Sequence, residues 1–323
     1  MRTVTSIVAT VIAFNSTAAM AAQQTFPSRP IRLIVGFAPG GNTDTVGRLV
    51  GQKLGERLGT QVVIDNRGGA GGTIGTEMAA RANPDGHTLT MGTTTTHAIA
   101  VAAYPTLQYD PVKDFAPIAL VAIAPYLLVV HPAVPARSLK EFVSVVKGQP
   151  GKYNYGSAGQ ATTTHLVMAT LTTRAGLDMT HVPFKGNGPA TTAVLAGEVQ
   201  ALFGALPPLL PHVSTGKVRA LAISSAKRSQ SLPDVPTVAE SGFPKFDVTL
   251  WLGFFAPRGT PPPVLKRLET ELVQIAQSAE MREMMSRQGL DANSGSAAEL
   301  GRLVAIEIEN YKTVFKQAGI KMQ

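Results

Sequence analysis

The sequence contains no cysteine. Disulfide bonds, thiolate metal sites and a cysteine nucleophile are therefore excluded. For the exported protein that the N-terminal residues predict (next paragraph), the absence of disulfides is more typical of a large domain in a bacterial periplasm than of a small secreted scaffold. The six histidines form neither a His-Glu-x-x-His nor a His-x-His pattern, so we expect no metal site and no other cofactor.

Long apolar runs are also missing after the N-terminus. No later segment approaches the ~20 continuous apolar residues of a membrane-spanning helix, so we expect a mature protein that is not embedded in a membrane. Near the start, Arg2 precedes an apolar run over residues 7–14 and then Ala19-Met20-Ala21, a small-x-small cleavage pattern. The sequence thus predicts a signal peptide over residues 1–21, cleavage near Ala21, and a periplasmic protein.

Clustered charge of one sign is absent. The net charge is +8, but lysines and arginines are scattered singly or in pairs, without a basic stripe interleaved with aromatic residues. We therefore expect no nucleic-acid partner. The positive balance fits two interpretations, solubility alone or a mild preference for acidic small molecules.

Patterns that indicate catalysis are missing too. Ser157 lies in Gly-Ser-Ala-Gly, which is not the G-x-S-x-G nucleophile elbow. The glycine run over residues 68–72 lacks dinucleotide-binding spacing, because the third glycine position is Ile74. We expect a binding protein and not an enzyme. A periplasmic hydrolase or isomerase is the alternative, since catalytic triads are recognised by geometry and not by sequence order.

What the sequence does contain is a strand followed by a glycine turn and a helix. Residues 31–35 are predicted as a buried strand, and Pro39-Gly40-Gly41 separates them from a helix that starts near residues 42–44. The glycines let the backbone turn its amides toward one point, and the helix start adds unpaired N–H groups and a positive dipole end. This stretch predicts a small anion-binding loop.

Similar arrangements recur further along the chain. Residues 154–159 form a predicted strand and glycine turn before a threonine cap at residues 162–164, and residues 185–189 form a third such turn. Another strand ends in the hydroxyls of residues 93–96 and in His97, which fit either a ligand site at a strand end or a threonine-rich helix cap.

Strands alternate with helices throughout, which predicts an α/β fold with two mostly parallel sheets. Strands are expected at residues 31–35, 62–66, 88–92, 117–130 (two segments separated by Pro125), 154–157, 179–184, 199–203, 218–224 and 248–256. An apolar turn is expected to begin at residues 204–208, and three helices close the chain over residues 263–278, 280–288 and 297–317. The chain is expected to cross between two lobes near residues 124 and 246, and such a double crossing would suit a hinged clamshell. Lobe 1 is expected to comprise residues 22–124 and 247–323, and lobe 2 residues 125–246.

Taken together, the motifs identify a family. They include residues 26–35, Phe37-Ala38-Pro39-Gly40-Gly41, Asp65-Asn66-Arg67, Asn83-Pro84-Asp85-Gly86, Tyr109-Asp110-Pro111, residues 181–186, residues 216–222 and Pro233-Asp234-Val235-Pro236-Thr237. Over essentially the whole mature chain the sequence closely resembles the Bug-type (tripartite tricarboxylate transporter) periplasmic solute-binding proteins. The resemblance implies a monomeric two-lobe clamshell that captures a small carboxylate and presents it to membrane transporter subunits, or alternatively to a sensor kinase.

The resemblance also implies a ligand site. One ligand carboxylate is expected between the loop at residues 37–41 and the segment at residues 157–163, with contacts from Ala38, Gly40, Gly41, Ser157, Gly159, Thr162 and Thr163, while Asp44 is expected to cap the helix. Further candidates are Phe37, Thr93, Thr94, His97, Lys185 and Ala205. Many family members have a polar group where this chain has Gly204-Ala205-Leu206. An apolar floor there, with Phe37 opposite, favours an aromatic or apolar mono- or dicarboxylate over an amino acid.

Overall fold

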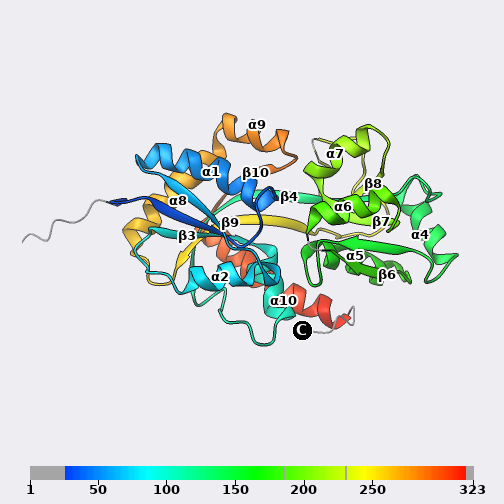
Figure 1. Ribbon diagram of the computed structural model, residues 1–323, viewed down its shortest axis with the longest axis horizontal. Coiled ribbons are helices and arrows are strands. Elements are labelled where there is room, and N and C mark those ends of the chain that lie inside the picture. Colours follow the sequence, from blue (N-terminus) through cyan, green and yellow to red (C-terminus); the bar gives the residue numbers. More distant parts are fainter. Residues whose placement is uncertain (1–25, 185, 230, 318–323) are drawn as a thin grey trace, which may run out of the picture.

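The protein has two lobes that are joined by shared strands (Figure 1). The computed structural model describes residues 26–184, 186–229 and 231–317. The predicted signal peptide over residues 1–21 lies outside this described part. The expected α/β class with two lobes is confirmed.

The first lobe begins with three parallel strands in the order β2-β1-β3, namely β1 (Ile31–Val35), β2 (Val62–Asn66) and β3 (Thr88–Thr93). Strand β1 is buried almost throughout, as its β-branched and apolar residues predict. The helical segments between and after these strands are α1 (Asn42–Leu58), η1 (Ala70–Gly72), α2 (Thr73–Ala80), η2 (Thr95–Ile99) and α3 (Ala100–Ala103). Each of the three strands leads into one of the turns that the sequence singled out.

A single long strand, β4 (Phe115–Val130), runs through both lobes. Residues 115–125 pair with β9 (Thr249–Pro257), whereas residues 126–130 pair with β7 (Ala201–Ala205) and β8 (Arg219–Ile223). The expectation of two separate segments here was wrong. Pro125 does not break the strand, because it lies where β4 changes partners and a missing donor is tolerated at such an irregular point.

The second lobe carries the sheet order β8-β4-β7-β5-β6. Its remaining elements are α4 (Leu139–Lys147), β5 (Asn154–Ser157), α5 (Thr163–Ala175), β6 (Thr180–Pro183), α6 (Asn187–Ala196) and α7 (Leu206–Ser214). An apolar turn was expected to begin at residues 204–208. This prediction was wrong from Leu206 onward, because helix α7 begins there. Prolines are accommodated in the first turn of α7, where a helix needs no intrahelical N–H donor.

The chain returns along β9 and ends on the first lobe with α8 (Pro262–Gln277), α9 (Ala279–Arg287), β10 (Asp291–Ser296) and α10 (Ala297–Gln317). Strand β10 pairs with β4 and was not predicted, because it has no apolar alternation. In Figure 1, α10 lies beneath the junction of the lobes, where it contacts α5 of the second lobe.

The two sheets are mixed, which corrects the expectation of mostly parallel pairing. Parallel ladders join β1 to β2 and β3, and β5 to β6 and β7. The ladders made by β4 and β9 are antiparallel, because the chain leaves the first lobe along β4 and comes back along β9 beside it. We keep the division into residues 22–124 with 247–323, and residues 125–246, as a proposal.

Close packing holds α1 on the first sheet. Glycines at positions 47, 51 and 55 recur once per turn on the face that meets β1 and β2. A Cβ added at Gly55 would lie 2.7 Å from the carbonyl oxygen of Thr60, and one added at Gly51 would lie 3.2 Å from Cγ1 of Val62. The helix can approach the sheet this closely at Gly55 only without a side chain there, and a side chain at position 51 would require Val62 to shift.

We predict that Gly55→Ala lowers the free energy of unfolding by about 1–3 kcal/mol, because the methyl group would overlap a backbone carbonyl that has little room to shift. The matched control is Gly188→Ala in the first turn of α6, where an added Cβ meets nothing within 4 Å. Urea unfolding of both variants should show no loss for the control. Equal stability of the two variants would contradict the packing argument.

Candidate functional site

The loop after β1 is held in place by a carboxylate of the protein itself. Asp44 Oδ2 accepts a hydrogen bond from the Gly40 N–H at 2.9 Å, and Asp44 Oδ1 accepts one from Asn66 Nδ2 at 3.0 Å. Asn66 Nδ2 also donates to the Phe37 carbonyl. Asp44 was expected to cap the helix, but α1 has Gly41 as its N-cap residue and no side-chain capping bond, so Asp44 instead fastens the loop that precedes the helix. The loop is preorganised, but the Gly40 amide is already occupied.

Other donors of this loop are still available. Gly41 is the N-cap residue of α1, and the first intrahelical bond runs from the Thr45 N–H to the Gly41 carbonyl. The amides of residues 42–44 therefore have no acceptor within the helix. The Asn42 Nδ2 atom is buried and has no hydrogen-bond partner within the described residues.

The second loop, residues 157–163, is tied together by its own hydroxyls. Ser157 Oγ donates to the Gly159 carbonyl at 2.9 Å, and Thr162 Oγ1 donates to the same carbonyl at 2.8 Å. Gly159 has φ +142°, a conformation that other residues rarely adopt. Thr162 is the N-cap of α5, yet its side chain makes no capping bond to the helix.

The third glycine turn, which leads into α6, lies against the loop at residues 157–163. The Gly186 N–H donates to the Ala158 carbonyl at 2.9 Å, and α6 starts at Asn187, whose Oδ1 atom is buried without a partner within the described residues. The candidate Lys185 lies outside the described residues.

The two lobes meet through hydroxyl groups. Thr95 Oγ1, at the start of η2 in the first lobe, lies 3.0 Å from Thr163 Oγ1, at the start of α5 in the second lobe. Both residues are buried. Thr95 was missed in the sequence, although the run of threonines at residues 93–96 pointed to it.

In the structure, Thr93 and Thr94 stabilise the turn that follows β3. Thr93 exchanges hydrogen bonds with Thr96 around the turn that follows β3. Thr94 Oγ1 donates to the Thr249 carbonyl at 3.3 Å and accepts from the Trp251 N–H at 3.1 Å, which fastens this turn to β9. Because both side chains are bonded within the first lobe, whereas the neighbouring Thr95 meets the second lobe, we remove both residues from the candidate set.

His97 is also removed, because it is a core residue. Its side chain is 0% exposed and stacks on Phe255 with ring centroids 4.1 Å apart, with Phe115 at 4.9 Å. Burial lowers the pKa of His97 to about 3, so the imidazole is neutral. Nδ1 lies 2.9 Å from Thr96 Oγ1.

An aromatic stack supports the second loop from behind. The rings of His165 and His181 lie parallel with centroids 3.8 Å apart, and Tyr155 stacks on His181 at 5.0 Å. Burial lowers the pKa of His165 to about 3 and that of His181 to about 4, so both rings are neutral. His181 Nε2 lies 2.6 Å from Ser157 Oγ and orients this hydroxyl.

Apolar residues lie at the end of β7, where the sequence predicts an apolar floor for the ligand site. Ala205 is 1% exposed, is the N-cap residue of α7, and lies in register with Tyr126 of β4. Leu206 beside it is buried. On the other lobe, Phe37 is half-buried, and its ring lies against Gly72.

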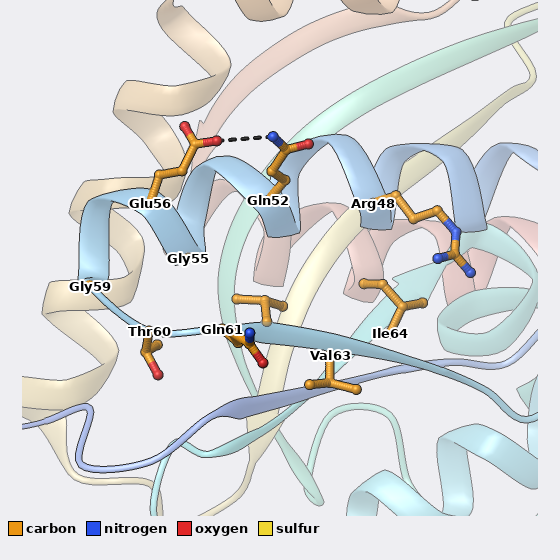
Figure 2. A pocket seen from close by; sticks show the side chains of 10 residues that line it. Arg48, Gln52, Gly55, Glu56, Gly59, Thr60, Gln61, Val63 and Ile64 are labelled. Atoms are coloured by element: carbon orange, nitrogen blue, oxygen red, sulfur yellow. Dashed lines mark hydrogen bonds between the residues drawn. The ribbon is translucent and has the colours of Figure 1, made fainter.

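Figure 2 shows a pocket away from these loops, with a volume of about 690 Å³. It lies between α1 and the edge strand β2, and it reaches the C-terminal end of the helix at Gly55 and Gly59. The candidate loops lie at the opposite, N-terminal end of α1. Within the described residues, no group of three or more histidine, aspartate and glutamate side chains could hold a metal ion.

Two lobes that share their crossing strands and oppose strand-to-helix loops define a two-lobe solute-binding receptor. The model of the tripartite tricarboxylate transporter family receptor matches residues 46–320. The chain therefore belongs to this family, which confirms the resemblance seen in the sequence. In the part of the chain that the structure describes, no helix has the length and apolar character to cross a membrane.

Known proteins resemble the whole chain. Protein BugT of Bordetella pertussis is 33% identical over 99% of both chains. Among solved structures, Rpa4515 of R. palustris with adipate is 34% identical with a TM-score of 0.86 and covers 91% of this chain and 99% of that one. MatC of Rhodopseudomonas palustris with bound malate is 37% identical with a TM-score of 0.81, and it covers 90% of this chain and 99% of that one.

The periplasmic binding protein BugD is also similar, with 34% identity and a TM-score of 0.83 over 92% of this chain and 100% of that chain. The family and these structural neighbours are solute-binding receptors and not enzymes.

We predict that Asp44→Asn destabilises the protein by about 1–3 kcal/mol at neutral pH, because an amide cannot accept all the bonds that the carboxylate accepts. Burial raises the pKa of Asp44, but hydrogen bonds from Arg48, Gly40 and Asn66 outweigh burial and hold the pKa below its ordinary value. The contribution is therefore present above about pH 4 and is lost as the pH falls through the lowered pKa.

Urea unfolding at several pH values measures this effect. The exposed Asp234, for which Asp234→Asn should change stability by no more than about 0.5 kcal/mol, is the control. A difference between wild type and Asp44→Asn that persists unchanged into strong acid would contradict the electrostatic explanation.

Proposed function

We propose that this protein captures a small carboxylate between its two lobes in the periplasm and delivers it to a tripartite tricarboxylate-type transporter. The observation that carries the proposal is the 3.0 Å contact between Thr95 and Thr163, because it brings the start of α5 against the first lobe. Family membership and the carboxylates named with two structural neighbours, adipate and malate, also support it.

The donors proposed in the two loops are uncharged. Residues 37–41 and 157–163 contain no lysine or arginine, so backbone amides and hydroxyls would bind the carboxylate. A hydrogen bond to a charged group contributes roughly 1.5–3 kcal/mol when water is excluded. Such a site can hold an anion in the closed form and release it when the lobes open.

The proposed ligand-binding residues are those of the two loops and the apolar floor, together with Lys185 of the third turn and with Thr95, which the sequence missed. They are Phe37, Ala38, Gly40, Gly41, Thr95, Ser157, Gly159, Thr162, Thr163, Lys185 and Ala205. A monomeric mature protein that begins after Ala21 is part of the same proposal.

Thr163→Val should weaken carboxylate binding about tenfold or more, because the isosteric methyl group leaves the opposed hydroxyl and the ligand without a partner. Thr173→Val, at an exposed position of the same helix, is the matched control and should bind as wild type does. Isothermal titration gives both affinities, and circular dichroism checks the fold. If Thr163→Val binds as tightly as wild type, the start of α5 is not part of the site.

The apolar floor at Ala205 and Leu206 favours an aromatic or apolar mono- or dicarboxylate. We expect terephthalate or adipate to bind more tightly than malate, citrate, aspartate or glutamate in a titration panel. Adding a hydroxyl to the floor with Ala205→Ser should reduce that preference. A clear preference of the wild type for aspartate would overturn the proposed ligand class.

A further inference from the structure

The second loop, residues 157–163, contains a strained residue. Ala161 has φ +55°, in the left-handed region that alanine rarely adopts, because its Cβ then lies too close to the following carbonyl oxygen. Such a conformation persists only where surrounding contacts fix it, and residues of this kind cluster at functional sites. The proposed capture of a ligand assigns no contact to Ala161.

His165 makes the hydrogen bond that fixes Ala161. Its Nδ1 atom accepts from the Ala161 N–H at 3.1 Å. His165 is the third residue of α5, so its side chain reaches back to the residue before the N-cap Thr162, much as the third residue of a capping box reaches back to the helix start. Ala161 is 7% exposed and His165 is 4% exposed, so water is largely excluded from this bond.

The stacked rings behind the second loop hold the acceptor atom in place. The ring of His165 lies parallel to that of His181, with centroids 3.8 Å apart. Burial lowers the pKa of His165 to about 3, and the neighbouring His181 lowers it further, so the ring is neutral. Because Nδ1 accepts a hydrogen bond, the one ring proton of His165 lies on Nε2.

Ala161 also belongs to the contact between the lobes. Ala161 and Leu166 join a buried apolar cluster whose other members all lie in the first lobe, among them Ile99 of η2 and Leu300 of α10. Glycine would adopt the left-handed conformation without strain, but it would lack the methyl group that Ala161 contributes to this cluster. The strained residue therefore lies where the second loop meets the first lobe.

The conformation of Ala161 sets the position of the first residues of α5. Thr162, the N-cap residue, follows directly, and Thr163 Oγ1 then lies 3.0 Å from Thr95 Oγ1 of the first lobe. The backbone of each residue turns only about φ and ψ. A change of φ at Ala161 would therefore rotate these threonines relative to the glycine turn that precedes them.

We propose that His165 is a positioning residue for the carboxylate site: by accepting the Ala161 N–H it keeps Ala161 in the left-handed conformation, which seats the second loop against the first lobe and orients Thr162 and Thr163. The inference rests on the proposed function for its effect on ligand affinity, but not for its effect on the conformation of the loop.

The ligand-free wild-type protein provides the first test. NMR of the imidazole nitrogens should show His165 neutral and protonated on Nε2 at neutral pH, and the backbone couplings of Ala161 should correspond to a positive φ. A proton on Nδ1 of His165 would overturn the inference, because this atom could then accept no hydrogen bond from Ala161.

Two substitutions of nearly the same shape separate the acceptor from the ring. Both His165→Asn and His165→Leu remove the imidazole stack, but the asparagine Oδ1 takes the place of Nδ1 and can accept the Ala161 N–H, whereas leucine offers no acceptor. The same NMR measurement should show that Ala161 keeps its positive φ in His165→Asn and leaves it in His165→Leu. Loss of this conformation in both variants, or in neither, would contradict the role of the hydrogen bond.

Titration with adipate provides the second test. His165→Leu should weaken binding about tenfold, because a buried amide loses its acceptor and the loop shifts, whereas His165→Asn should lose at most about threefold. Circular dichroism checks that both variants are folded. Equal affinities of the two variants would show that the acceptor does not position the site.

Glycine at position 161 provides a rescue that a merely structural role of His165 would not give. Ala161→Gly alone should lose at most about threefold in affinity, the effect of one buried methyl group. Because glycine keeps the left-handed conformation without help, adding His165→Leu to Ala161→Gly should cause little further loss. A tenfold loss from His165→Leu in both backgrounds would overturn the inference.

The two proposals fail in different ways. If no carboxylate binds but Ala161 changes conformation in His165→Leu and not in His165→Asn, the proposed ligand is wrong and the positioning role is supported. If adipate binds wild type and His165→Leu equally tightly, the proposed function is supported and the role of His165 is overturned.

Discussion

The long strand β4, which runs through both lobes, is the constraint on which the rest of the structure depends. Because β4 pairs with β9 in the first sheet and with β7 and β8 in the second, one strand joins the two lobes, and its pairing partners change near Pro125. This arrangement brings η2 against the start of α5, so that hydroxyls from distant parts of the sequence meet across the junction.

In the proposed site, the balance of charge around this junction would allow the receptor both to hold and to release an anion. The loops offer neutral donors, the histidines behind them are kept neutral by burial, and Asp44 stabilises the first loop from inside the protein. A fixed cation in the cleft would bind more tightly but would also oppose release. In the described part of these loops, binding strength would therefore depend on closure.

Local patterns predicted most of the fold, and tertiary contacts decided the rest. Buried runs such as residues 31–35 and the capping box at Ser138 identify their elements without help from other parts of the chain. Strand β10 was missed because it exists only through pairing with β4. At the candidate site, the pattern marked the threonine run but could not tell Thr95, which faces the other lobe, from Thr94, which faces β9. His97 was misplaced because its aromatic neighbours come from β9 and from the start of β4.

The most direct test of a carboxylate gripped by both lobes is amide hydrogen exchange of the protein with and without saturating adipate. We predict that residues 37–45 and 157–166 both become protected, because the loops and the first turns of α1 and α5 close over the same anion. Protection confined to one lobe, or found instead along α1 and β2 at the pocket of Figure 2, would contradict this account.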